Sequence, residues 1–140
     1  MDAATDPWDN EYHYATQTEI DTTIGSDYYD IGHNFNISGG GNAGCIGCVC
    51  TDGIKGRGWT GSLNPTGDAF DIDYVSHEMG HQFGGRHTMN FCFRDSNGST
   101  TVEPGSGSSI MGYAGVCETN VQNNTDAHFN YVNIRDIQNN

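Results

Sequence analysis

The chain has 140 residues, enough for one domain, and it is acidic and rich in glycine: 18 acidic residues against 5 basic ones give a net charge of −13, and 20 residues are glycine. Such a charge disfavours nucleic acids and anionic membrane surfaces as partners. No stretch is apolar over the roughly 18 residues that a membrane-spanning helix needs, and residues 1–7 lack the basic and apolar regions of a signal peptide, so we expect any leader or pro-segment to have been removed.

The N-terminal third is expected to form a helix followed by a strand. Residues 8–24 carry apolar side chains at roughly helical spacing and end before Gly25, which predicts a helix packed on one face of a sheet. Residues 28–37 are rich in aromatic and β-branched side chains and predict a strand. We interpret His33 in this strand as a structural histidine rather than a metal ligand. Residues 38–44 form a glycine-rich loop.

Five cysteines in a chain of this length indicate an oxidising compartment and therefore a secreted protein. Three of them are crowded together, at Cys45, Cys48 and Cys50. This C-x-x-C-x-C pattern could form a second metal site, but it offers three thiols and no fourth ligand nearby. We therefore favour a local disulfide and one spare thiol. Residues 46–60 otherwise resemble short extended pieces broken by a turn at residues 52–53.

A connection rich in turn residues leads to the central helix, for which Asp71 is the expected N-cap. Asp68, Asp71 and Asp73 could instead bind calcium. Their spacing matches no complete calcium loop, so capping and solvation are favoured and calcium stays unsupported. A stripe of apolar side chains at helical spacing is expected to be buried against the sheet: Ile72, Val75, Met79 and Phe83.

One motif carries the chemistry, H-E-x-x-H-x-x-G-x-x-H, and it begins at His77. His77 and His81 lie one helical turn apart, so both imidazoles leave the same face. Gly84 can take a positive φ, which ends the helix and lets His87 return as a third ligand. Three protein ligands with a fourth position open are typical of a catalytic zinc site, and we expect one Zn²⁺ per chain. Glu78 lies where a carboxylate can reach the attacking water rather than the metal.

The chain after this motif is rich in loops until a C-terminal helix expected at residues 126–137. Cys92 and Cys117 flank the loop that runs from the third histidine to the end of the turn around Met111. A disulfide between them would staple this part of the site, and we predict it. Met111 lies in a turn-forming setting rich in glycine and serine, and Tyr113 follows it.

The zinc motif and the downstream methionine turn together resemble the metzincin zinc metallopeptidases, closest to the reprolysin-like (adamalysin-type) branch and its bacterial members. One departure is the turn itself, S-I-M-G-Y, which is nearer to astacin-like or serralysin-like turns. The resemblance implies an α+β fold: a twisted mixed sheet with a backing helix and a central active-site helix, then an irregular lower subdomain and a C-terminal helix. It implies one catalytic domain over residues 1–140, with an upper subdomain at 1–84 and a lower one at 85–140. Relative to metzincins, the chain is expected to be truncated at its N-terminus, with open sheet edges. Thr88 stands where eukaryotic adamalysins usually have Asp.

The resemblance also implies roles for individual residues. Met111 would form an apolar floor beneath the three imidazoles, and Tyr113 would approach the zinc or the developing oxyanion. The segment before the active-site helix maps to an exposed edge strand, whose free N–H and C=O groups receive an extended peptide. The substrate-binding residues would be Gly56, Arg57, Gly58, Trp59 and Thr60.

The predicted function is a secreted zinc endopeptidase that acts on polypeptides, with Glu78 as the general base for a metal-activated water. The alternative is a non-catalytic, zinc-stabilised structural or self-assembling subunit derived from such a protease, whose copies associate through exposed sheet edges. The presence of Glu78 favours the enzyme, because a scaffold needs no general base.

Overall fold

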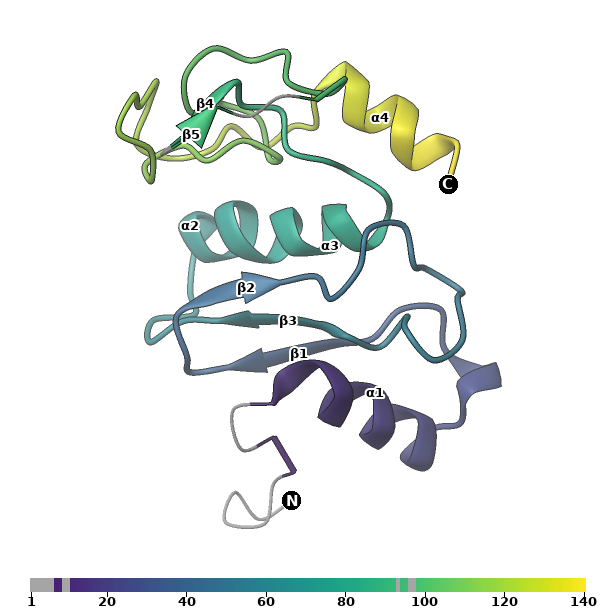
Figure 1. The fold of residues 1–140 in the computed structure, drawn as a ribbon. Helices are drawn as coiled ribbons and strands as arrows, with labels where there is room; N and C mark the ends of the chain where they lie inside the picture. Colours follow the sequence, from purple (N-terminus) through teal and green to yellow (C-terminus); the bar gives the residue numbers. More distant parts are fainter. Residues whose placement is uncertain (1–6, 9–10, 93, 96–97) are drawn as a thin grey trace.

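The computed structural model describes residues 7–8, 11–92, 94–95 and 98–140. A three-stranded sheet lies between helix α1 (Tyr12–Thr23) on one face and a longer helical body on the other, and the C-terminal part of the chain covers the far side of that body (Figure 1). The fold class is therefore α+β, as the sequence predicts. None of the helices in the described part of the chain combines the length and hydrophobicity that crossing a membrane requires.

Helix α1 begins four residues later than the start predicted at residue 8. Its N-cap is Glu11, whose carboxylate accepts hydrogen bonds from the backbone N–H groups of His13 and Tyr14, at 3.2 Å each. The helix ends before Gly25, which has a φ of 94° that side-chain-bearing residues rarely adopt. A short 3₁₀ helix follows at Ser26–Tyr28, so the strand predicted over residues 28–37 is shorter than expected.

The sheet contains β1 (His33–Asn36), β2 (Gly40–Asn42) and β3 (Gly58–Gly61) in the order β1-β3-β2. Strand β3 runs parallel to β1 and antiparallel to β2. The prediction of an exposed edge at residues 55–60 is therefore wrong, because β3 is the central strand and has a neighbour on each side. The strand at the edge near the active-site helix is β2, within the segment that the sequence analysis interpreted as a loop.

The central helical body consists of α2 (Asp68–Phe70), a π-helical segment η3 (Asp71–Ser76) and α3 (His77–Gln82). Its N-cap is Gly67, so the prediction of Asp71 as the cap is wrong. The apolar stripe is also only partly correct: Phe83 stays 39% exposed, and no member of the stripe is fully buried. A π-helical turn holds more residues than an α-helical one, so the 3.6-residue period does not persist through η3.

In the described residues of the C-terminal part, the regular elements are the short antiparallel strands β4 (Phe91–Cys92) and β5 (Arg94–Asp95) and helix α4 (Tyr131–Gln138). Helix α4 begins later than predicted, after Asn130, which caps it. The buried side chain of Asn133 donates a hydrogen bond of 2.7 Å to the carbonyl of Arg86 and so fixes α4 against the loop that follows the active-site helix.

The five cysteines form two disulfides and leave one thiol. Cys45 pairs with Cys48, and Cys50 is free and exposed, so the prediction of a local disulfide with a spare thiol is confirmed. The second disulfide joins Cys92 to Cys117 and packs with Met89 in a small buried cluster, which Tyr113 contacts.

Candidate active site

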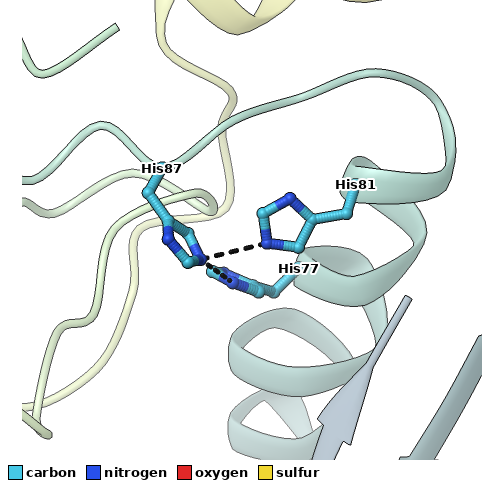
Figure 2. Close-up of side chains that lie close together, drawn as sticks. All are labelled: His77, His81 and His87. Carbon is cyan, nitrogen blue, oxygen red and sulfur yellow. Dashed lines mark hydrogen bonds between the residues drawn. The ribbon is translucent and has the colours of Figure 1, made fainter. Parts of the chain in front are cut away.

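The three histidines of the motif converge on one point. His77 and His81 project from α3, and His87 approaches them from the loop that follows the helix (Figure 2). The Nε2 atom of His87 lies 3.2 Å from that of His77 and 3.0 Å from that of His81. The loop can return because Gly84 has a φ of 105°, as the sequence analysis expected.

Hydrogen bonds at the other ring nitrogens determine which atoms face inward. Nδ1 of His77 lies 2.7 Å from the carbonyl oxygen of Ile110, and Nδ1 of His81 lies 2.7 Å from that of Gly85. A carbonyl oxygen only accepts, so both Nδ1 atoms carry the proton and both Nε2 atoms present lone pairs. A proton on Nε2 of His87 can be donated to only one of the Nε2 atoms of His77 and His81, so nitrogen lone pairs face one another at the centre of the triad. This donor set fits a cation that prefers imidazole nitrogen, such as Zn²⁺.

The electrostatics of the triad also favour a metal. Burial, together with the charges of its two neighbours, lowers the pKa of His77 to about 3. Burial and then His81 lower the pKa of His87 to about 4, and burial lowers the pKa of His81 as well. All three imidazoles are therefore neutral near pH 7, the form in which histidine binds a metal.

The carboxylate of Glu78 lies beside the triad, between two cavities. Burial raises its pKa to about 7, and a hydrogen bond from the backbone of Ala43 opposes this rise. Its side chain packs closely on β2, since a Cβ atom at Gly41 would lie 2.6 Å from Cγ of Glu78. The cavities measure about 590 and 480 Å³, and Gly41, Glu78 and Tyr113 line both of them.

Tyr113 and Met111 both lie at the triad. The Tyr113 ring centroid is 4.6 Å from that of His87 and 5.4 Å from that of His77. Met111 is fully buried, and a Cβ atom at Gly80, between the first two ligands on α3, would lie 2.6 Å from its sulfur. The positions of both side chains are compatible with the roles that the resemblance implies.

The structure places residues 56–60 away from both cavities. The backbone N–H of Gly56 donates to Gln17, and the guanidinium of Arg57 donates to a carbonyl in its own loop. The indole of Trp59 packs on α1, where its ring centroid lies 5.1 Å from that of Tyr12. These contacts are structural, so the assignment of this segment to substrate binding has no support at the cavities.

A hydrogen-bond network that includes Thr60 joins the sheet to α3, and Gly58 lies against two of its side chains. His33 lies between two partners: its Nδ1 is 2.7 Å from Oε1 of Gln82, and its Nε2 is 2.8 Å from Oγ1 of Thr60. Gln82 is fully buried and also donates to the carbonyl of Gly32 at 3.0 Å. The interpretation of His33 as structural agrees with these contacts.

Three contributors to the site were not predicted from the sequence. The edge strand β2 lacks β-branched residues, so no strand signal marked it. The loop closed by the Cys45–Cys48 disulfide caps the C-terminal end of α3. The backbone N–H of Gly47 donates to the backbone carbonyl of His81, and that of Cys48 donates to the backbone carbonyl of Gln82, both at 2.9 Å. Glu103 is a buried acid near the turn that carries Met111, and only its burial, which no local pattern encodes, sets it apart.

Comparison with protein families gives a match over residues 1–140 to the family described as Metallo-peptidase family M12B Reprolysin-like. A search of curated proteins found no match, and a search of solved structures found none either. The family match extends over the helix with the first two histidines, the third histidine and the turn around Met111. It confirms the resemblance that the motif indicated.

Proposed function

Because the chain belongs to the reprolysin-like metallopeptidases of family M12B, we propose that it is a secreted zinc endopeptidase in which Glu78 is the general base. The position of Glu78 carries this proposal. Its carboxylate lies beside the three zinc-binding histidines and lines both cavities. Its pKa of about 7 lets it accept and return a proton near neutral pH.

The catalytic roles of this chain's own residues follow from their positions. The triad of His77, His81 and His87 would hold zinc, which would polarise the scissile carbonyl and lower the pKa of the attacking water. Glu78 takes the proton from that water and passes it to the leaving amine. Tyr113 contacts two ligand rings, so we assign its hydroxyl to the oxyanion, where a donor stabilises developing charge. Met111 packs behind α3 and keeps the floor of the site apolar.

The substrate is expected to be an extended polypeptide paired with β2. This strand lies at the edge of the sheet, and Gly41 and Asn42 line a cavity beside the triad. An edge strand can add a peptide through main-chain hydrogen bonds. We assign the side chain that follows the scissile bond to the cavity of about 480 Å³, which residues 112–116 wall.

Secretion is proposed from the two disulfides, because such bonds persist in oxidising compartments. Free-thiol counting on protein recovered from the culture medium tests it, and one reactive thiol per chain is expected.

Self-association through sheet edges stays a prediction. Measurement of the solution mass over a range of concentrations checks it.

The deciding experiment compares cleavage of an unfolded protein by the wild type and the Glu78→Gln variant, both loaded with one equivalent of zinc. Loss of a general base is expected to lower the rate about 10²–10⁴-fold while the zinc content stays unchanged. Glu118→Gln, a change to an exposed acid in the same chain, is the matched control and should cleave as the wild type does. If neither wild type nor variant cleaves while both hold zinc, the peptidase proposal fails and the zinc-stabilised structural subunit is favoured.

A further inference from the structure

Glu103 is a buried acid outside the zinc motif, and both oxygens of its carboxylate accept hydrogen bonds. Glu103 is 8% exposed to solvent. One carboxylate oxygen accepts hydrogen bonds from the backbone N–H groups of Ser108 at 3.0 Å and Ser109 at 3.1 Å, and the other accepts from the hydroxyl of Ser109. Burial alone would raise the pKa of Glu103, but these hydrogen bonds and one from Thr88 outweigh it, so the group stays ionised near neutral pH.

The turn that this carboxylate holds supplies the carbonyl that orients the first zinc ligand. Ile110 follows Ser109 directly, and its carbonyl accepts the Nδ1–H of His77 at 2.7 Å. The next carbonyl, that of Met111, accepts from the backbone N–H of Thr88 at 3.1 Å. Displacement of the turn would therefore move the acceptor that fixes the His77 ring.

The backbone of Glu103 also holds the extended segment at residues 88–90 that follows the third ligand. Its N–H donates to the carbonyl of Thr88 at 2.9 Å, and its carbonyl accepts from the N–H of Asn90 at 2.9 Å. Met89 and Glu103 form a parallel β-bridge between these two bonds. One residue thus connects the chain next to His87 with the turn that orients His77.

We infer that Glu103 is a positioning residue for zinc binding, whose carboxylate fixes the turn at residues 108–111 so that the carbonyl of Ile110 orients His77. Glu103 touches no reacting atom. Hydrogen-bond partners behind a metal ligand set its tautomer and direction, and their loss weakens metal affinity about 10–100-fold. The inference rests on the zinc site and not on peptide hydrolysis, so it stands or falls independently of the cleavage assay.

Zinc affinity, measured by competition with a chelator, tests this inference. Glu103→Ala removes the acceptor for the partly buried N–H of Ser108 and the buried N–H of Ser109, and the dissociation constant is expected to rise about 10–100-fold. Glu103→Gln keeps an oxygen for both N–H groups, while its amide can donate to the hydroxyl of Ser109, so affinity within about threefold of the wild type is expected. Glu118→Ala, at an exposed site, should change nothing.

A second measurement separates positioning from general stability. The imidazole Nδ1–H signal of His77 in the zinc-loaded protein reports its bond to Ile110, and it should shift or broaden in the alanine variant and recover in the glutamine variant. If the alanine variant does not fold, Glu103→Asp replaces it, since this change keeps the charge but withdraws the carboxylate by one methylene. A folded alanine or aspartate variant with unchanged zinc affinity and an unchanged His77 signal would overturn the inference, even if its unfolding temperature were lower.

Discussion

Replacement of Gly58 by alanine is expected to destabilise the chain through one defined collision. Gly58 lies in β3 under the hydrogen bond between Gln82 and His33. A Cβ atom there would lie 2.5 Å from Nδ1 of His33 and 2.6 Å from Cδ of Gln82, closer than real Cβ contacts occur. Both side chains are held by further partners, so neither can move aside without breaking another bond.

The magnitude follows from three contributions. A methyl group forced into a filled space costs about 1–3 kcal/mol, and the broken hydrogen bond adds about 1 kcal/mol. The lower backbone entropy of alanine in the unfolded chain offsets about 0.4–1 kcal/mol. A net loss of about 2 kcal/mol is expected, which for 140 residues lowers the unfolding temperature by about 7 °C.

Thermal and denaturant unfolding of four zinc-loaded variants tests this explanation. Gly39→Ala is the control, because a Cβ atom at Gly39 would meet nothing within 4 Å, and its stability should stay within about 0.5 kcal/mol of the wild type. Gly58→Ala combined with Gln82→Ala should be more stable than the sum of the single changes by about 1–2 kcal/mol, because the second change removes one of the two colliding side chains and frees the other, His33, from its bond to Gln82. Strict additivity of the two changes would refute the collision as the cause.

Three further predictions concern the site and its support. Gly41→Ala should lower kcat about 10²-fold with unchanged zinc content, because its methyl group would lie 2.6 Å from Cγ of Glu78 and displace the carboxylate. Zinc affinity, measured by chelator competition, should hardly change between pH 7 and pH 6, because burial and the neighbouring imidazoles lower the pKa of His77 to about 3 and that of His87 to about 4, so these two ligands gain no proton in this range. A tenfold loss at pH 6 would contradict this. Joint replacement of Cys92 and Cys117 by serine should cost about 3 kcal/mol in the free energy of unfolding, measured in denaturant.

The zinc ligands could be predicted because their spacing is local. His77 and His81 lie four residues apart within a regular α-helical segment, and Gly84 marks the point where the chain must turn. The order of the strands could not be predicted in the same way. It depends on pairing between segments that are far apart in sequence, and residues 40–42 contain no side chain that favours a strand. The exposed edge near the active-site helix was therefore assigned to β3, although β2 is the strand at that edge.

Glycine has more than one meaning in a strand, and this ambiguity explains the wrong assignment. A glycine permits close approach of any group, whether a substrate backbone or a side chain of the same protein. At Gly58 the approaching groups are Gln82 and His33, and at Gly41 the approaching group is Glu78. Only the second of these glycines lies at a cavity beside the triad. The sequence shows the glycines but not what approaches them.

The π-helical segment shows why errors in the central helix left the metal site unaffected. Segment η3 ends at Ser76, immediately before His77. An i→i+5 turn there changes the directions of the residues before it relative to those after it, so a stripe that crosses the boundary loses its alignment. The first two ligands and Gln82 all lie after the boundary, in α3, where α-helical spacing holds. The geometry of the first two ligands therefore depends on the six regular residues of α3, while the helix start and the apolar stripe depend on the irregular segment before them.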